Sequence, residues 1–392
     1  MKRVAFKSSR VKSYIAVGVL VVTSFWVGDR FHGMVWNPLV PAHSRLEFSS
    51  LNDIYATMQD KFDGKITDQA ALDGAKAGLV AAGGDPYTTY LTSTQAKSLN
   101  DSLSGALSGI GAEIGMKNGL LTVISPIKGS PAITAGVQAG DVIVTIDGND
   151  TTGMTVEGAV TKIRGKAGTV VKLKLARVGT DPVTLSITRA DITVPSVTWS
   201  MKTGNVGLIT LSRFGPDTAQ LTSQAASELK GQGATKIILD LRNNGGGYLN
   251  AGVSVASEFL GVGKTVVSER TNGKTVDTMN VTNSGVLVGL PMVVLINGGS
   301  ASASEIVAGA LHDNGAAKLI GEQSFGKGSV QEIQNLPGGA ELKITVAHWY
   351  TPKGVNINKS GLTPDVKVGL TTDDFNNNRD PQLDAALAEL QK

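Results

Sequence analysis

Apolar and polar positions divide the chain into a helical region, a region of short strands, and a region where strands and helices alternate. Between Leu46 and Val80 apolar residues recur at helical spacing, and a Gly-Gly-Asp-Pro sequence at 83–86 ends that pattern. From Leu103 to Ile192, short alternating segments bounded by glycine predict strands. From Gly204 onward, apolar runs alternate with helical patterns, which predicts an α/β core.

The strand-rich region has a defined order of elements. Strand patterns cover 112–114, 120–124, 140–146, 169–177 and 183–189, and helical patterns cover the middle of 130–139 and all of 155–163. Gly109, Ile110 and Gly111 precede the first of these strands. Glycines allow successive N–H groups to converge on an anion such as a terminal carboxylate, and an edge strand can pair with a peptide backbone. The order of elements and the sequence AGVQAGDVIVTIDG resemble a circularly permuted PDZ domain.

In the α/β region a glycine-rich loop follows the predicted strand 236–240. The sequence from Asp240 to Gly247 is DLRNNGGG, and a predicted helix follows at 249–259. Glycines at this junction can present several backbone N–H groups to one anion. A phosphate-binding P-loop is the alternative, but the Lys-Ser/Thr pair that such a loop requires is missing.

A second strand–turn–helix junction carries the candidate chemistry. The predicted strand 288–296 is followed by Asn-Gly-Gly, by Ser300, Ser302 and Ser304, and by a helical pattern at 305–312. A hydroxyl at this corner would lie near free N–H groups of the helix N-terminus, which favour a developing negative charge. The structural alternative is that Ser302-Ala-Ser-Glu305 is only a capping box.

Lys327 lies between two glycines in the sequence FGKGSVQ, with Gln331 four residues later. A serine nucleophile needs a base, and a lysine can serve if burial lowers its pKa towards neutrality. A glutamine could orient the amine without keeping it protonated. The structural alternative is an exposed lysine in a loop.

The sequences SASASEI and FGKGSVQ resemble the carboxyl-terminal processing (tail-specific) peptidase family. Its Ser–Lys–Gln spacing matches the 25 residues from Ser302 to Lys327 and the four from there to Gln331. The resemblance runs from about Leu51 to the C-terminus. It implies that Ser302 is the nucleophile, Lys327 the general base and Gln331 the orienting residue.

The same resemblance assigns further residues. It places the oxyanion hole at Gly246 or Gly247 together with the N–H of Ala303, although this chain has Gly245 where the family usually has proline. The peptide-binding residues of the PDZ-like domain would be Gly109, Ile110, Gly111 and Val160. The sequence DPYTTYL at 85–91 also matches the family, and we interpret its aromatic residues as packing residues.

The implied fold class is α+β and multidomain: an N-terminal helical region, a β-rich PDZ-like domain, and a crotonase/ClpP-like α/β peptidase core. The expected divisions are a basic N-terminus with a signal-anchor at 1–36, a helical region at 37–102, the PDZ domain at 103–192, the peptidase core at 193–370, and a C-terminal helical tail at 371–392.

The N-terminus has the features of a membrane anchor. Five basic residues precede the apolar sequence YIAVGVLVVTSFWV at 14–27, and no A-x-A-like cleavage site follows it. This favours an uncleaved signal-anchor over a cleaved signal peptide. We expect a bacterial cell-envelope protein with its catalytic part outside the cytoplasm, or a secreted protein if the segment is removed.

Composition excludes other classes. There is no cysteine, so thiol catalysis is excluded, and the four histidines have no helical metal-ligand spacing. The net charge of the chain is +3, and five of its positive charges lie at the N-terminus, so the remainder carries 3 − 5 = −2. This balance gives no reason to expect nucleic-acid binding. We expect no metal and no cofactor. The expected partners are proteins or peptides with free C-termini, the membrane, and possible further copies of the chain.

We considered three other interpretations, and the sequence argues against each of them. The first is an inert PDZ scaffold that binds protein C-termini, and the second is a crotonase-like acyl-CoA enzyme, which the PDZ-like insert disfavours. The third is a Ser–His–Asp triad with His312 and Asp313. His312 is ten residues from Ser302 along the predicted helix, about 15 Å, and is too far away unless that helix breaks.

Overall fold

A computed structural model describes residues 49–392 with the exception of 128 and 178–180. The chain forms two compact units, residues 1–71 and residues 72–392. The predicted signal-anchor at 1–36 therefore lies outside the described residues. Within the described part of the chain, no helix is both long and apolar enough to cross a membrane.

The described part of the helical region, from residue 49 to 102, contains helices α2 and α3 and most of α4. Helix α2 covers Ser49–Lys61, α3 covers Asp68–Ala81 and α4 covers Ser93–Ser104. The predicted helix between Leu46 and Val80 is thus confirmed over most of its length but is wrong at 62–67, where Asp63 and Gly64 interrupt the pattern. Thr92 begins α4 with a complete capping box involving Gln95.

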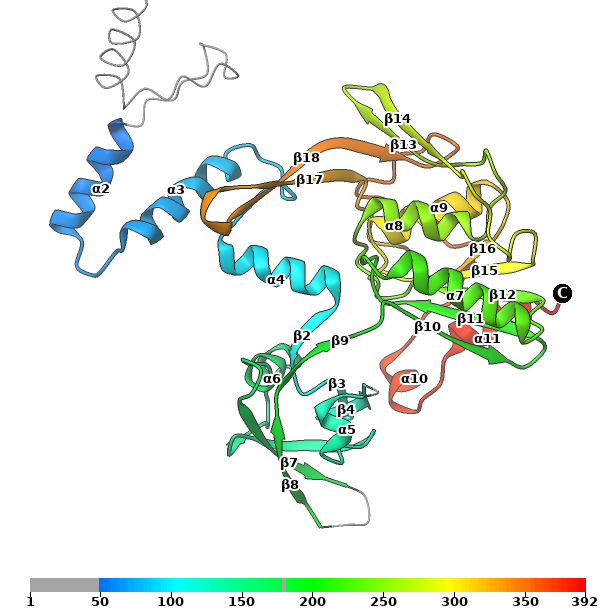
Figure 1. The fold of residues 1–392 in the computed structure, drawn as a ribbon, viewed down its shortest axis with the longest axis horizontal. Helices are drawn as coiled ribbons and strands as arrows, with labels where there is room; N and C mark the ends of the chain where they lie inside the picture. The colour runs from blue at the N-terminus through cyan, green and yellow to red at the C-terminus, as the bar shows by residue number, and fades with distance from the viewer. Residues whose placement is uncertain (1–48, 128, 178–180) are drawn as a thin grey trace, which may run out of the picture. The chain divides into compact units, whose positions relative to one another are not determined.

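The strand-rich region forms a sheet of its own, drawn in cyan to green in Figure 1. Its strand order is β3-β4-β5-β7-β8, with β6 paired to β5. The elements are β3 (Ala112–Lys117), β4 (Leu120–Pro126), α5 (Pro131–Thr134), β5 (Val142–Ile146), β6 (Asn149–Asp150), α6 (Val156–Ile163), β7 (Val170–Ala176) and β8 (Val183–Thr188). Alternate residues of β7 are buried, as expected of a strand with one face on a core. Strand β3 lies at an edge of this sheet.

A two-stranded ladder connects this domain to the rest of the chain. Strand β2 (Ala106–Gly109) enters the domain, β9 (Ala190–Thr193) leaves it, and the two pair in antiparallel fashion from Ala106↔Thr193 to Gly109↔Ala190. The adjacent strands are visible in Figure 1. Both connections of the domain therefore run through one short ribbon.

The α/β core is a six-stranded sheet in the order β10-β11-β12-β15-β16-β19. Strand β10 is antiparallel to β11, and every other pair is parallel. The strands are β10 (Val197–Lys202), β11 (Val206–Leu211), β12 (Lys236–Asp240), β15 (Met292–Ile296), β16 (Lys318–Gly321) and β19 (Val366–Lys367). All five residues of β15 are buried, which is typical of a central strand covered on both faces.

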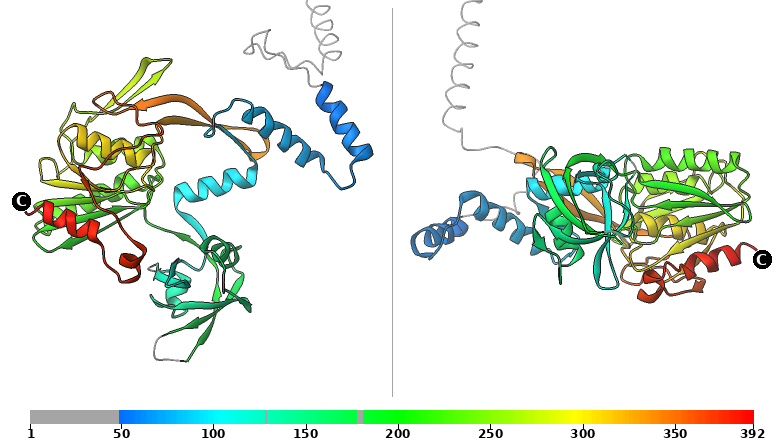
Figure 2. Two further views of the ribbon diagram at one scale, coloured as in Figure 1. Left: turned by 180° about the vertical axis from the view of Figure 1, so that it is seen from behind. Right: turned by 90° about the horizontal axis from the view of Figure 1, so that it is seen from below.

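Helices cover both faces of this sheet (Figure 2). Helices α7 (Thr218–Gly231), α8 (Leu249–Ser257) and α9 (Ala303–Asp313) share the larger core cluster. Helix α11 (Pro381–Glu389) packs on the other face through Ala386 and Leu390. Arg242, just after β12, forms ion pairs with Asp240 and with Asp380 at the start of α11, so the C-terminal helix is fixed to the central sheet.

A second sheet lies beside the core. It has the order β1-β18-β13-β14, and β17 also pairs with β18. The strands are β1 (Thr89–Leu91), β13 (Thr265–Thr271), β14 (Lys274–Asn280), β17 (Ser329–Asn335) and β18 (Glu341–Tyr350). Because β1 pairs with β18 from Thr89↔Lys343 to Leu91↔Glu341, the DPYTTYL sequence is held next to the segment that contains Lys327.

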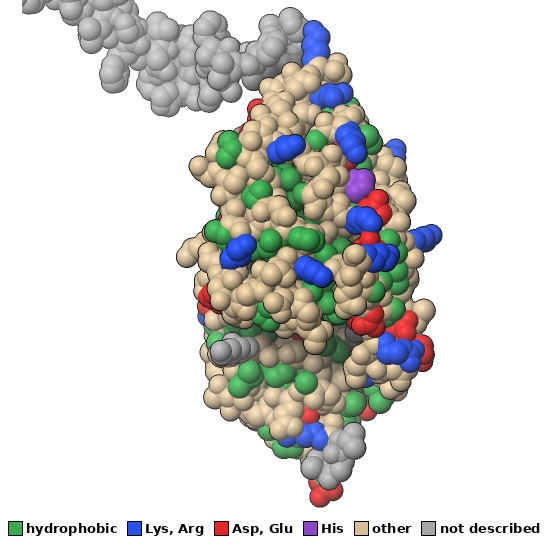
Figure 3. Space-filling view, turned by 90° about the vertical axis from the view of Figure 1, so that its right-hand side faces the viewer, with side chains coloured by type: hydrophobic (Ala, Val, Ile, Leu, Met, Phe, Trp, Pro, Cys, Tyr) green, Lys and Arg blue, Asp and Glu red, His purple; other side chains and the backbone are tan. Residues whose placement is uncertain are grey.

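The face drawn in Figure 3 carries charged side chains of both signs. On this face most lysine and arginine side chains stand apart from one another, and acidic side chains lie among them.

The remaining short elements are a 3-10 turn at Pro337–Gly339 and helix α10 (Thr372–Asn376).

Candidate active site

The turn between β15 and α9 holds Ser302 in an unusual backbone conformation. Its φ is 54° and its ψ is −116°, a region that a non-glycine residue adopts at a cost. The neighbouring Ser300 and Ser304 are fully buried, and their hydroxyls donate to the carbonyls of Leu241 and Asn244. Of the three alternate serines, Ser302 is therefore the one that lines the cleft next to this turn.

The glycine-rich loop after β12 packs directly against this turn. Asn244 is fully buried, and its side chain donates to the Leu211 carbonyl and accepts the N–H of Gly246. A methyl group at Gly246 would lie 2.8 Å from the Ser302 Cβ and 3.0 Å from the Ala303 nitrogen. Only glycine permits this approach, which explains the glycine at this position.

Two backbone N–H groups beside Ser302 are unused. Two hydrogen bonds join the Gly247 segment to Phe214: the Phe214 N–H donates to the Gly246 carbonyl, and the Tyr248 N–H donates to the Phe214 carbonyl. Among the described residues, neither the N–H of Gly247 nor that of Ala303 has an acceptor. The N–H of Gly246, by contrast, is occupied by Asn244.

A single buried carboxylate connects the serine turn to the lysine loop. Glu305 has no exposed surface. Its Oε2 accepts the N–H groups of Ser302 and Lys327, both at 2.9 Å. Its Oε1 accepts the Gly326 N–H at 2.7 Å and the Ser324 hydroxyl at 2.6 Å. These four donors satisfy a buried charge that forms no ion pair within the described residues.

The lysine loop requires its glycines for close packing. A methyl group at Gly326 would lie 2.8 Å from the Gly361 nitrogen, and one at Gly328 would lie 2.8 Å from that of Asn358. The Lys327 carbonyl accepts the indole N–H of Trp349 at 2.9 Å. Both sides of the Lys327 backbone are therefore fixed.

The Lys327 amine lies in an environment that disfavours its charge. Burial lowers the pKa of Lys327 below the ordinary value for lysine, the like charge of Lys343 lowers it further, and the Glu305 carboxylate opposes both effects. The amine is also 5.5 Å from the centre of the Tyr87 ring. The DPYTTYL sequence thus reaches the site, and our interpretation of its aromatic residues as packing residues is incomplete for Tyr87.

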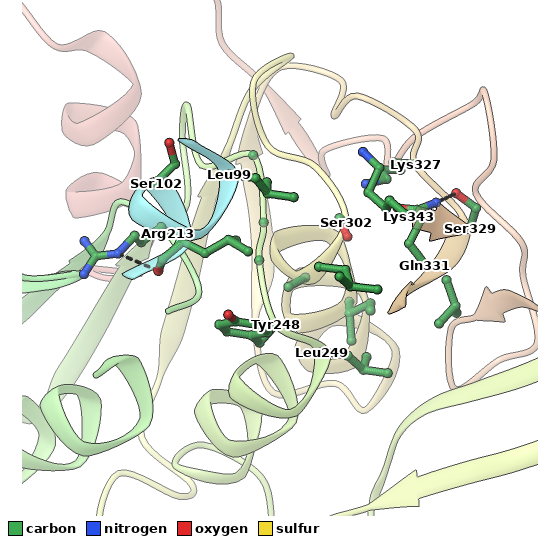
Figure 4. A pocket seen from close by; sticks show the side chains of 18 of the residues that line it. Leu99, Ser102, Arg213, Tyr248, Leu249, Ser302, Lys327, Ser329, Gln331 and Lys343 are labelled. Carbon is green, nitrogen blue, oxygen red and sulfur yellow. Dashed lines mark hydrogen bonds between the residues drawn. The ribbon is translucent and has the colours of Figure 1, made fainter. Parts of the chain in front are cut away.

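Gln331 lines the same cleft, but within the described part of the chain it forms no hydrogen bond with the Lys327 amine. Its amide donates to the Ser329 hydroxyl at 2.7 Å and to the Thr345 hydroxyl at 3.3 Å. Figure 4 shows the Gln331 and Ser329 side chains joined by this hydrogen bond, below Lys327 and Lys343. The orienting contact expected from the sequence is thus not formed in this conformation.

These groups surround one cleft of about 420 Å³. Ser302, Lys327 and Gln331 lie along its wall, facing Tyr248 and Leu249 in Figure 4. No hydrogen bond joins the Ser302 hydroxyl to the Lys327 amine within the described residues, although such contacts are often loose in unliganded sites. The apolar part of the lining comprises Leu99, Leu103, Leu249, Ile306, Val330, Ile333 and Trp349.

The expected ligand-binding residues of the PDZ-like domain lie at its β3 edge. Gly109 ends β2, Ile110 is buried, and Gly111 has a φ of 74°. Val160 lies on α6, which contacts β3, and it is partly exposed and outside the buried cluster of the domain. Ile163, on the same helix, is buried in that cluster.

The structure excludes the Ser–His–Asp alternative, as the distance along the predicted helix indicated. Helix α9 runs unbroken from Ala303 to Asp313, so His312 lies at the opposite end of the helix from Ser302. His312 instead lies 3.2 Å from the carboxylate of Asp365.

The chain matches two family models, Peptidase family S41 over residues 205–368 and a PDZ domain over residues 122–177. It is 40% identical over 324 residues to the carboxy-terminal processing protease CtpA of Bacillus subtilis (strain 168), covering 83% of this chain and 69% of the relative. This chain belongs to peptidase family S41 and is a serine-type C-terminal processing peptidase.

Further relatives agree. A probable CtpA-like serine protease of Staphylococcus aureus (strain bovine RF122 / ET3-1) is 35% identical over 371 residues, which are 94% of this chain and 73% of the relative. Among solved structures, the photosystem II D1 C-terminal processing protease matches with a TM-score of 0.52 and 33% identity, covering 82% of this chain and 88% of that one.

We predict that Glu305→Gln weakens the fold and abolishes peptidase activity. An amide offers one accepting oxygen, and its NH₂ group would face two of the four donors. We expect the free energy of unfolding in urea to fall by about 3 kcal/mol or more. The control is Glu322→Gln, at a partly exposed carboxylate that accepts no hydrogen bond within the described residues. Wild-type stability and activity in Glu305→Gln would contradict this role.

Proposed function

We propose that the peptidase works through a Ser302–Lys327 dyad. The observation that carries this proposal is the cleft itself: a strained serine beside two unused N–H groups, lined also by a lysine whose pKa burial lowers. The Ser302 hydroxyl attacks the scissile carbonyl while the neutral Lys327 amine accepts its proton. The resulting ammonium returns that proton to the departing amine, and water then hydrolyses the acyl-enzyme.

The oxyanion of the tetrahedral intermediate is held by the N–H groups of Gly247 and Ala303 in this proposal. Both residues line the cleft, and neither N–H has an acceptor among the described residues. Ala303 is also the first residue of α9, where the helix dipole favours negative charge. Gly246 serves a different purpose, since its N–H binds Asn244 and its missing side chain admits Ser302.

Gln331 is proposed as the residue that orients Lys327 once substrate is bound. Its amide belongs to the same cleft, but it must first leave Ser329 and Thr345. The Lys327 amine then acquires a neutral partner that does not favour its protonation.

We predict that Ser302→Ala, Lys327→Ala and Lys327→Arg each lower kcat/KM by at least about 10³-fold and leave the fold intact. Arginine fails because its guanidinium does not deprotonate in proteins. Purified residues 37–392 are incubated with a denatured protein, and the products are identified by mass spectrometry. Ser302→Ala also excludes a contaminating protease. Full activity in Lys327→Arg would eliminate the lysine as the base.

We further propose that the PDZ domain selects substrates by their free C-termini. Strand β3 has an unpaired edge, α6 contacts it, and the backbone at Gly109–Gly111 leads into it. A peptide adding to this edge would place its last side chain against Val160 and its carboxylate at the glycines. An inert scaffold would share this binding but not the cleavage.

The tail proposal predicts that amidating the C-terminus of a peptide weakens its binding by roughly tenfold or more, because a hydrogen-bonded charge is worth about 1.5–3 kcal/mol. Fluorescence anisotropy on the Ser302→Ala protein measures binding without cleavage. Val160→Asp should also weaken the binding of the peptide with a free C-terminus. Because Val160 lies outside the domain core, this substitution should not unfold the domain. Equal affinities for free and amidated peptides would leave the domain without this role.

We also propose that the N-terminal segment keeps the enzyme at the membrane, outside the cytoplasm. Support comes from five basic residues followed by 14 largely apolar residues at 14–27. Full-length protein expressed in bacteria should sediment with membranes and resist extraction by salt, whereas residues 37–392 should be soluble. A full-length chain found in the soluble cytoplasmic fraction would refute the anchor.

A further inference from the structure

Lys343 is an unassigned cation in the catalytic cleft. It lies on β18, opposite Ile333 of β17 and Thr89 of β1, and it lines the cleft together with Lys327 and Gln331. Figure 4 shows the Lys327 and Lys343 side chains next to each other. Lys343 is partly buried, and within the described residues it forms no hydrogen bond or ion pair.

The lining of the cleft contains no acidic side chain that would neutralise this charge. Its basic residues are Arg213, Lys327 and Lys343, and none of the residues lining it is aspartate or glutamate. Arg213 is already compensated, since its guanidinium pairs with Asp217 and donates to the carbonyls of Leu103 and Ser104. The two lysines thus share a cleft without a counter-charge on its wall.

The charged and titratable groups around Lys327 come from several elements. Lys343 approaches from β18, Glu305 from α9, and the Tyr87 ring from the segment before β1. Arg213 and Tyr248 lie elsewhere on the lining. Glu332 alternates with Gln331 and Ile333 along β17, is exposed and faces away from the cleft.

Glu305 is a poor counter-charge for either amine. Its two oxygens already accept four hydrogen bonds, from two loop amides, the Ser302 amide and the Ser324 hydroxyl. Its carboxylate binds the Lys327 backbone N–H, but it forms no ion pair with the Lys327 amine within the described residues. The group that disfavours a proton on Lys327, apart from burial, is therefore Lys343.

We propose that Lys343 acts through Lys327: its positive charge disfavours a second ammonium in the cleft and keeps the Lys327 amine neutral and ready to accept the Ser302 proton. This proposal rests on the proposed dyad. Lys343 touches no reacting atom and is a positioning residue, which works by charge rather than by contact.

The positive charge of Lys343 also favours the return of the proton from Lys327 to the departing amine. When Lys327 has accepted the hydroxyl proton, the cleft holds two ammonium groups, and their repulsion makes Lys327 a stronger acid. The proton then passes from Lys327 to the nitrogen of the departing amine as the bond between that nitrogen and the carbonyl carbon breaks. Lys327 returns to its neutral form, and the proton balance closes.

Lys343→Met tests this inference because it keeps the length of the side chain and removes the charge. Without the like charge, the pKa of Lys327 rises, so the acidic limb of the kcat/KM profile moves to higher pH. We expect a several-fold loss at neutral pH that shrinks steadily as the pH is raised. Lys343→Arg keeps the charge and should keep the wild-type limb. Lys274→Met, at an exposed lysine of β14, is the matched control.

A merely structural role would give a loss that is independent of pH. A Lys343→Met profile that is parallel to wild type, or a Lys343→Arg profile displaced as far as that of Lys343→Met, would overturn the proposal.

A titration that needs no turnover separates this inference from the dyad. The Ser302→Ala protein is labelled with trace acetic anhydride at a series of pH values, and mass spectrometry gives the extent of labelling at Lys327. The midpoint should lie at higher pH when Lys343→Met is added. An unchanged midpoint refutes the role of Lys343. If instead the midpoint moves while Ser302→Ala still cleaves protein, the dyad is wrong and the charge coupling stands.

Discussion

The site depends on the Glu305 carboxylate more than on any other single group. A carboxylate removed from water is costly unless donors replace the lost hydration, and Glu305 receives four. Because two of these donors are the backbone amides of Ser302 and Lys327, the requirement of one buried charge sets the relative position of two loops that are 25 residues apart. The hydrogen bond to the Ser302 amide also offsets the strain of that residue's backbone.

The two sheets then define the surroundings of the lysine. Strand β18 pairs with β17, which carries Gln331, and with β1, which follows Tyr87, and it contributes Lys343 and Trp349 itself. Groups that are distant in sequence thereby come together in the cleft that Lys327 lines. A lysine serves as a base at neutral pH only if its ammonium form is disfavoured, and here burial and a like charge both act in that direction.

Much of this arrangement could be predicted from the sequence, because its signals are local. Apolar runs predicted β12 and β15, and glycines shortly before Ser302 and on both sides of Lys327 marked the loops. What could not be predicted depends on pairing between distant segments. Glu305 had the signature of a capping residue, and its contacts with the lysine loop became visible only in the fold. Lys343 was one of several strand lysines, and strand β14 is too exposed to show a clear pattern.

The most direct test of the account is to find which serine hydroxyl is the nucleophile. A peptidyl diphenyl phosphonate reacts with an activated serine hydroxyl and leaves a stable adduct, which peptide mapping by mass spectrometry can place on one residue. We expect the adduct on Ser302 alone, at a rate that falls as the pH is lowered and that is lost in Lys327→Ala. An adduct on Ser300 or Ser304, or unchanged labelling of Ser302 without Lys327, would contradict the account.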